Sequence, residues 1–132
     1  MADLATITIN DGEDTPVAHV FEPMSCSNGN AGYNNLADQT WSAGQERIDL
    51  SSNPRRKIRP VKTVMRIPKV VTEVVNSVNV NKVLNFGTVT TTYNIPDDWE
   101  EQDKENLRVL NVNLQQSTVV TDLVEEGGVV HG

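Results

Sequence analysis

The chain has 132 residues, of which 37% are hydrophobic and only six are aromatic, and its formal net charge is -7. This length fits one domain and excludes a catalytic barrel or two folded domains. No run of 18 apolar residues and no basic, apolar leader is present, which predicts a soluble protein made in the cytosol. A single cysteine, Cys26, excludes an internal disulfide framework and leaves a free thiol or an intermolecular bridge as alternatives.

The charge is unevenly distributed along the chain. Nine of the eleven Lys and Arg residues lie between Arg47 and Lys82, a window with only two acids, Asp49 and Glu73. A basic centre with acidic flanks is the pattern of a protein that holds a polyanion on one surface. Solvated charge on an ordinary surface is the alternative interpretation.

Short alternating runs over the first 95 residues predict β-strands. We expect an N-terminal hairpin from residues 5–9 and 16–21, a loop at residues 23–32, and a connecting loop at residues 76–81. Pro68 is expected to interrupt the longest strand region. The further predicted strands cover residues 33–37, 45–51, 58–67, 70–75 and 83–95.

Alternation divides these strands between an apolar face and a polar face. In an antiparallel sheet one face can stay open to water if the other is packed, here by the helices that follow. The open face is predicted to carry Arg47, Asp49 and Ser51, then Lys62, Val64 and Arg66, then Thr88, Thr90 and Thr92, with Arg55, Arg56, Lys57 and Arg59 near a strand connection. Such a cationic, hydroxyl-rich surface suits phosphate binding, although polar β-branched residues are also ordinary on a solvated strand.

After Pro96 the period becomes helical. Asp97 is a candidate N-cap with Glu100 three residues later, which predicts a helix over residues 98–114. Ser117 begins a second helix that Gly127 should end. The first helix presents an apolar stripe of Trp99, Leu107, Leu110 and Leu114. This stripe must cover an apolar surface, and the sparse aromatic content suggests that a second copy of the chain completes the core.

The segment from Arg66 to Val75, the Asn-rich loop after it, the strand ending Tyr93-Asn94-Ile95-Pro96 and the two helices resemble the coat protein of single-stranded RNA bacteriophages, the leviviruses. The order of elements is similar along the whole chain. The resemblance implies an α+β fold in one coat-protein domain over residues 1–132: a hairpin (1–22), a five-stranded antiparallel sheet (33–95) and two helices (97–126) that interlock in a homodimer. Its partners would be further copies of itself in an icosahedral shell and single-stranded genomic RNA, with no membrane and no cofactor.

The resemblance also implies residue roles. RNA-facing positions fall on strand residues that the charge pattern selects as well, namely Arg47, Asp49, Ser51, Lys62, Val64, Thr88, Thr90 and Thr92. Contacts between dimers would come from the loop of Asn76, Ser77, Val78, Asn79, Val80 and Asn81. The chain would be made in the bacterial cytoplasm and act in the virion.

The chain departs from the family on its last strand. Relatives that bind an operator hairpin place an aromatic residue and an amide where this chain has Thr88 and Thr90. Because base stacking on an aromatic contributes about 1–3 kcal/mol, genome packaging is a better supported prediction than translational repression by hairpin binding.

Other function classes have less support. His19, His131 and Cys26 show neither a catalytic pairing nor metal-ligand spacing, so we predict no enzyme and no metal site. A small dimeric RNA-binding regulator remains the main alternative, because it would need the basic surface without a shell.

Overall fold

The computed structural model describes residues 4–37, 42–54 and 57–127. Residue contacts group into two compact units, Met1–Asn94 and Ile95–Gly132, and each is described by itself. Arg55 and Arg56, predicted to lie near the basic surface, are outside the described residues.

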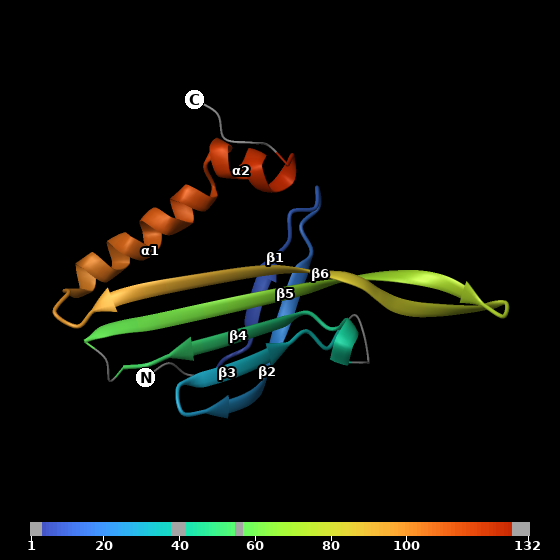
Figure 1. Cartoon of the computed structure of the whole chain (residues 1–132), viewed down its shortest axis with the longest axis horizontal. Helices are drawn as coiled ribbons and strands as arrows, with labels where there is room; N and C mark the ends of the chain where they lie inside the picture. Colours follow the sequence, from blue (N-terminus) through green and yellow to red (C-terminus); the bar gives the residue numbers. More distant parts are fainter. Residues whose placement is uncertain (1–3, 38–41, 55–56, 128–132) are drawn as a thin grey trace. The chain divides into compact units, whose positions relative to one another are not determined.

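The first unit is a six-stranded antiparallel sheet whose strands follow one another in chain order (Figure 1). This confirms the predicted fold class. The sheet has six strands rather than five, because β2 pairs with β1 in the N-terminal hairpin and then continues into pairing with β3. The strands are β1 (Ile7–Asn10), β2 (Ala18–Ser27), β3 (Asn30–Asn34), β4 (Arg47–Ser52), β5 (Ile58–Val75) and β6 (Val78–Pro96), with a 3₁₀ turn, η1 (Ser42–Gly44), before β4.

The predicted loop at residues 23–32 is wrong. Residues of β2 and β3 pair through most of it, and a tight turn at Asn28 and Gly29 joins the two strands. Both turn residues have positive φ, 25° and 83°, a conformation that Asn and Gly adopt more readily than other residues. Ser-rich and Asn-rich composition predicted irregular structure, but cross-strand pairing with β3 overrides that weak propensity.

Two predictions about β5 and β6 are also wrong. Pro68 does not interrupt β5, because β4 pairs with β5 only as far as Arg66 and leaves Pro68 with a neighbour on one side. The expected loop at residues 76–81 is only a two-residue turn at Asn76 and Ser77, with φ of 51° and 64°. Val78–Asn81 therefore begin β6, and the ends of β5 and β6 extend beyond β4 as a two-stranded ribbon (Figure 1).

The hydrophobic core of this unit lies on one face of the sheet. Phe21, Tyr33 and Ile48 are buried there, and Ile7, Ala31, Leu50 and Met65 pack against them partly buried. The register places Ile48 opposite both Tyr33 and Met65. Since side chains alternate along a strand, the residues between these positions face the other side of the sheet.

The second unit contains α1 (Glu101–Gln115) and α2 (Thr118–Glu125). The N-cap of α1 is Glu100 and not Asp97, and the backbone N–H of Glu100 donates to the Asp103 carboxylate at 3.2 Å. The helix therefore starts later than predicted, and Trp99 precedes it rather than lying on its stripe. The predicted N-cap Ser117 and the left-handed Gly127 are confirmed at the two ends of α2. No helix in the described part of the chain is long and apolar enough to cross a membrane.

A charged cluster joins the N-terminal hairpin to the start of β4. His19 Nδ1 lies 2.6 Å from Glu46 Oε1, and His19 Nε2 lies 2.9 Å from Asp11 Oδ2. Carboxylates only accept, so both ring nitrogens must donate and the imidazole is held as its cation. These bonds, that to Glu46 first, raise the pKa of His19 to about 9. Asn35 Nδ2 donates to the same Glu46 oxygen at 2.8 Å.

This cluster predicts an alkaline loss of stability. The pKa of His19 is higher in the folded protein, about 9, than its ordinary value of 6.5, so its contribution is complete below pH 6.5 and disappears as the pH rises through 9. Between pH 7 and pH 10 the free energy of unfolding should fall by on the order of 1 kcal/mol more in the wild type than in His19→Gln. Urea unfolding of both proteins at pH 7 and pH 10 measures this difference in the free energy of unfolding. An equal fall in the variant would contradict the assignment.

Gly29 is the glycine that the sheet requires most strictly. Its φ is +83°, and an added Cβ would lie 2.4 Å from the backbone oxygen of Ser52. Gly29→Ala should lower the free energy of unfolding by about 1–3 kcal/mol, because it combines left-handed strain with a backbone clash. Gly12→Ala is the matched control, since its Cβ would meet nothing within 4 Å. Equal urea midpoints for the two variants would disprove the close approach.

Candidate nucleic-acid interface

The open face of the sheet is defined by cross-strand register. Arg47 lies opposite Arg66, Asp49 opposite Val64, and Ser51 opposite Lys62. All six residues therefore share the face away from the Phe21 core, as the alternation predicted. On the neighbouring strand β3, Asn30 and Gly32 pair with Ser51 and Asp49 and extend the same face.

The polar residues of β6 share this face with Arg66. The guanidinium carbon of Arg66 lies 3.5 Å from the centroid of the Phe86 ring, a cation–π contact between β5 and β6. Because side chains alternate, Thr88, Thr90 and Thr92 are on the same side of β6 as Phe86. All three threonines are exposed.

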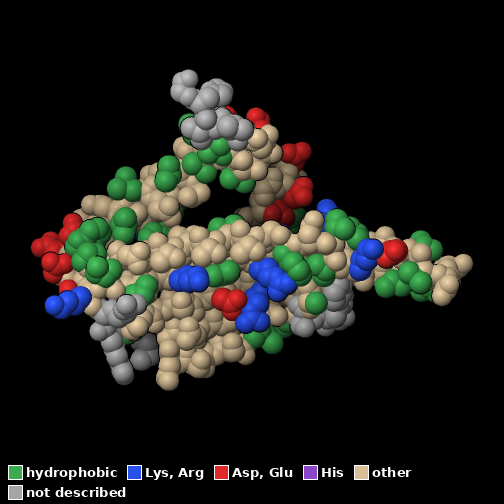
Figure 2. Space-filling model, viewed as in Figure 1, with side chains coloured by type: hydrophobic (Ala, Val, Ile, Leu, Met, Phe, Trp, Pro, Cys, Tyr) green, Lys and Arg blue, Asp and Glu red, His purple; other side chains and the backbone are tan. Residues whose placement is uncertain are grey.

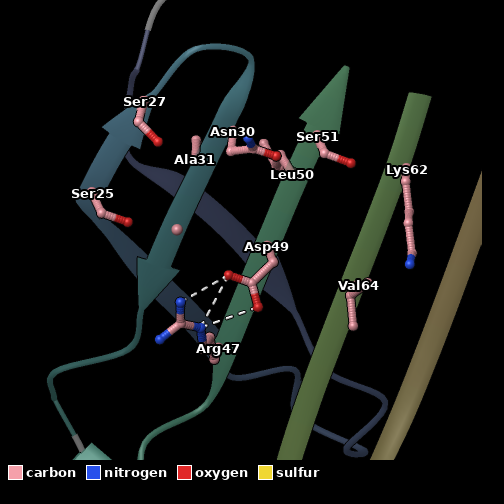
Figure 3. A pocket seen from close by; sticks show the side chains of 11 residues that line it. Ser25, Ser27, Asn30, Ala31, Arg47, Asp49, Leu50, Ser51, Lys62 and Val64 are labelled. Atoms are coloured by element: carbon pink, nitrogen blue, oxygen red, sulfur yellow. Dashed lines mark hydrogen bonds and ion pairs between the residues drawn. The ribbon is translucent and has the colours of Figure 1, made fainter. Parts of the chain in front are cut away.

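A shallow depression of about 320 Å³ lies in the middle of this face (Figure 3). Serine hydroxyls, an asparagine amide and two cations surround it, together with the Asp49 carboxylate. Hydroxyl, amide and cationic groups are the donors that proteins direct at phosphate and sugar oxygens. Its polar lining residues are Ser25, Ser27, Asn30, Arg47, Asp49, Ser51 and Lys62.

The cations of the open face differ in whether a carboxylate pairs with them. Arg47 Nε donates to both carboxylate oxygens of Asp49, at 3.0 and 3.1 Å, and this carboxylate raises the pKa of Arg47 above its ordinary value. Lys62 is exposed and makes no ion pair with any residue in the described ranges. Figure 2 shows Lys and Arg side chains as an interrupted row along the strands, with an acidic patch between them.

The remaining predicted basic residues are not all brought to this face. Lys57 is exposed and lines a separate depression with Ile58, Pro60 and Asn94. Arg59 is half-buried, and alternation along β5 places it on the side of Met65 rather than that of Lys62.

Sequence reasoning missed four residues of the face. Ser25, Ser27 and Asn30 were assigned to a loop, although the alternation of Ser25 and Ser27 before Asn28-Gly29 is a hairpin signal. Phe86 was overlooked, although it lies two residues before Thr88 and therefore on the same side of the strand. The open face thus includes an aromatic residue, 44% exposed, that the sequence analysis did not use.

The other predicted contact surfaces are apolar and exposed. On the ribbon, Val74, Val75, Val78 and Val80 are 68%, 46%, 60% and 44% exposed. Neither helix contains a buried residue, and Leu110 and Leu114 of the predicted stripe are 67% and 56% exposed. Among the residues described, no group of three or more His, Cys, Asp or Glu side chains could hold a metal ion.

The sequence matches a known protein family, and the fold matches known proteins. Residues 2–130 match the family described as Levivirus coat protein. No curated protein sequence matches the chain. The fold is similar to that of a virus-like particle of bacteriophage NT-214 (TM-score 0.87, 21% identity, covering 98% of this chain and 100% of that one). It is also similar to a virus-like particle of bacteriophage ESE058 (0.85, 17%, 98% and 100%) and to the bacteriophage GA capsid protein (0.77, 19%, 96% and 98%). The chain belongs to the levivirus coat protein family, and it is a structural protein of the virion capsid.

Proposed function

We propose that this coat protein assembles as dimers into an icosahedral shell and packages single-stranded RNA on the open face of its sheet. The observation that carries the RNA assignment is the register of β4 and β5, which collects Arg47, Lys62 and Arg66 on the face opposite the apolar core. Cations on an otherwise hydroxyl-rich surface supply sequence-independent attraction for a phosphate backbone.

The edge of the sheet supports a dimer. β6 is 19 residues long and is the last strand of the sheet, so one of its sides has no strand partner within the described chain. Long open edges are usually paired or covered in native proteins. A second copy pairing along β6 would satisfy this edge and join the two open faces into one surface.

The helices are further evidence for a second copy of the chain as the partner. Their apolar side chains are exposed within the chain, and Val119 and Val124 of α2 reach 65% and 75%. Exposed apolar helix faces mark contacts between proteins. We assign these faces, including Leu107, Leu110 and Leu114, to the interlocked dimer that the family resemblance implies.

The ribbon is the proposed contact between dimers. Its turn, Asn76 and Ser77, projects beyond β4, and valines on both sides of the turn are exposed. An apolar tip on a polar ribbon fits burial against another copy. The similar chains from bacteriophages ESE058 and NT-214 form virus-like particles, which supports assembly of this chain into a shell.

Packaging is favoured over translational repression. Thr88 and Thr90 provide hydroxyls but no aromatic surface for stacking a particular base, and the ring of Phe86 on the same side of β6 is in contact with Arg66. A dimeric RNA-binding regulator without a shell is the alternative function. Particle size separates the two, because the regulator would elute as a dimer and the coat protein as a megadalton assembly.

The RNA assignment predicts a salt dependence that single substitutions reduce. Lys62→Gln and Arg66→Gln should each weaken binding to all single-stranded RNAs and flatten the log-log salt slope by roughly 0.7, because each removes one phosphate contact. Fluorescence anisotropy over a salt series measures both quantities. Arg108→Gln in α1 is the control and should keep the wild-type slope. Equal slopes for all four proteins would mean that the open face does not hold the phosphates.

The ribbon assignment predicts an assembly defect without unfolding. Val74→Thr combined with Val78→Thr keeps β-branched shape but adds hydroxyls at two highly exposed apolar positions. We expect dimers to persist while the yield or the size uniformity of shells falls, as seen by size-exclusion chromatography and electron microscopy. Val17→Thr, at a residue 55% exposed near the β1–β2 turn, is the control. Wild-type shells from the double variant would rule out the ribbon contact.

A further inference from the structure

Two arginine residues occupy directly opposed positions on the open face. Arg47 of β4 and Arg66 of β5 are register partners. Like charges at directly opposite positions of neighbouring strands repel each other. The structure relieves this repulsion by holding each guanidinium on a different partner.

Arg47 is held by a carboxylate. Its Nε lies 3.0 and 3.1 Å from the two oxygens of Asp49, and its terminal Nη2 lies 3.0 Å from Asp49 Oδ1 (Figure 3). This arrangement occupies the donor fork that arginine presents to a phosphate group. Both side chains are 47% exposed, so the pair lies within reach of a ligand on the open face.

Arg66 is held by an aromatic ring instead. Its guanidinium carbon lies 3.5 Å from the centroid of the Phe86 ring. A contact of this kind with a ring face leaves the guanidinium N–H groups able to donate to an anion. Phe86 carries no charge, so Arg66 keeps its full attraction for an anion. Of the two opposed arginines, only Arg47 forms an ion pair with a carboxylate in the described part of the chain.

We propose that the Asp49–Arg47 ion pair is a clamp that a backbone phosphate of single-stranded RNA must open, because the Asp49 carboxylate takes the place of the phosphate on Arg47. Binding exchanges the Asp49 carboxylate for a phosphate oxygen on the Arg47 fork, while Arg66, which lies over Phe86 of β6, binds phosphate without such an exchange. The inference deepens the proposed RNA-packaging function and rests on it.

The exchange gives Asp49 a role opposite to that of the cations around it. RNA gains a contact with Arg47 only by breaking the ion pair between Arg47 and Asp49. Arg47 therefore contributes less to the affinity for RNA than its charge suggests. The released carboxylate then lies close to the bound phosphate and repels it. Asp49 therefore lowers affinity for every RNA without regard to sequence.

Asp49→Asn tests the clamp, because it removes the charge and keeps the shape. We expect binding to single-stranded RNA to tighten by about two- to fivefold, the range of an exposed ion pair, for several unrelated sequences. Arg47→Gln should have little effect in the wild type but a larger one in the Asp49→Asn background. Subunits dissociated from the assembled shells are titrated against short RNAs at one salt concentration. Fluorescence anisotropy then gives the affinity of the wild type, the two single variants and the double variant.

Glu73→Gln is the matched control. Glu73 forms the other ion pair of the basic window, with Lys82 at 2.9 Å, and both partners are 50% exposed. The substitution changes the net charge equally but leaves the open face intact, so we expect little change in affinity. Asp49→Ser, which leaves no side-chain amide near Arg47, is a second variant and should tighten binding as Asp49→Asn does.

The outcomes separate the clamp from the proposed function. Equal tightening by Glu73→Gln would show a general charge effect, and weaker binding by Asp49→Asn would show that Asp49 itself contacts RNA; either result overturns the clamp. Additive effects of Arg47→Gln in the two backgrounds would overturn it as well. Loss of the Lys62→Gln effect and of all salt dependence would instead refute RNA binding by this face.

Discussion

The register between β4 and β5 is the constraint on which the rest of this structure depends. It pairs Ile48 with Met65 on one face and Arg47 with Arg66 on the other. A slip by one residue would turn the cations toward the Phe21 core and the apolar side chains toward water. Burial of the apolar face therefore fixes the position of the cations, even though no attraction among the cations favours their proximity.

The small core leaves many apolar side chains of the described residues exposed. Only Phe21, Tyr33, Ile48 and Ile95 are buried hydrophobic residues in the part of the chain that the structure describes. Exposed apolar residues on the ribbon, the edge strand β6 and the helices far outnumber them. Exposed apolar surface of this kind is stabilising when it is buried against other copies of a chain, which fits the proposed assembly. Membership of a coat protein family is consistent with that balance.

The sequence allowed the strand faces to be predicted because alternation survives in β4 and β5, where Ile48 and Leu50 alternate with Arg47 and Asp49. The prediction of strands failed where composition was used in place of cross-strand pairing. Ser25 and Ser27 belong to a strand because β3 supplies their partners, and Val78 belongs to β6 because the Asn76-Ser77 turn is tight. Contacts made by side-chain ends, such as Arg66 on Phe86 or His19 between two carboxylates, depend on register across strands. No local pattern encodes them.

The two acids of the basic window change how its charge should be understood. Asp49 pairs with Arg47 at the centre of the open face, and Glu73 pairs with Lys82 on the ribbon. Each acid neutralises a cation from the same window. Under the proposed function, the attraction for RNA would come from cations without an ion pair among the described residues, such as Lys62 and Arg66. A packaging surface must hold a long phosphate chain of any sequence at many points, and weak, exchangeable contacts suffice because they act together. Placing an acid beside one arginine of an opposed pair weakens a single contact while leaving the collective attraction intact.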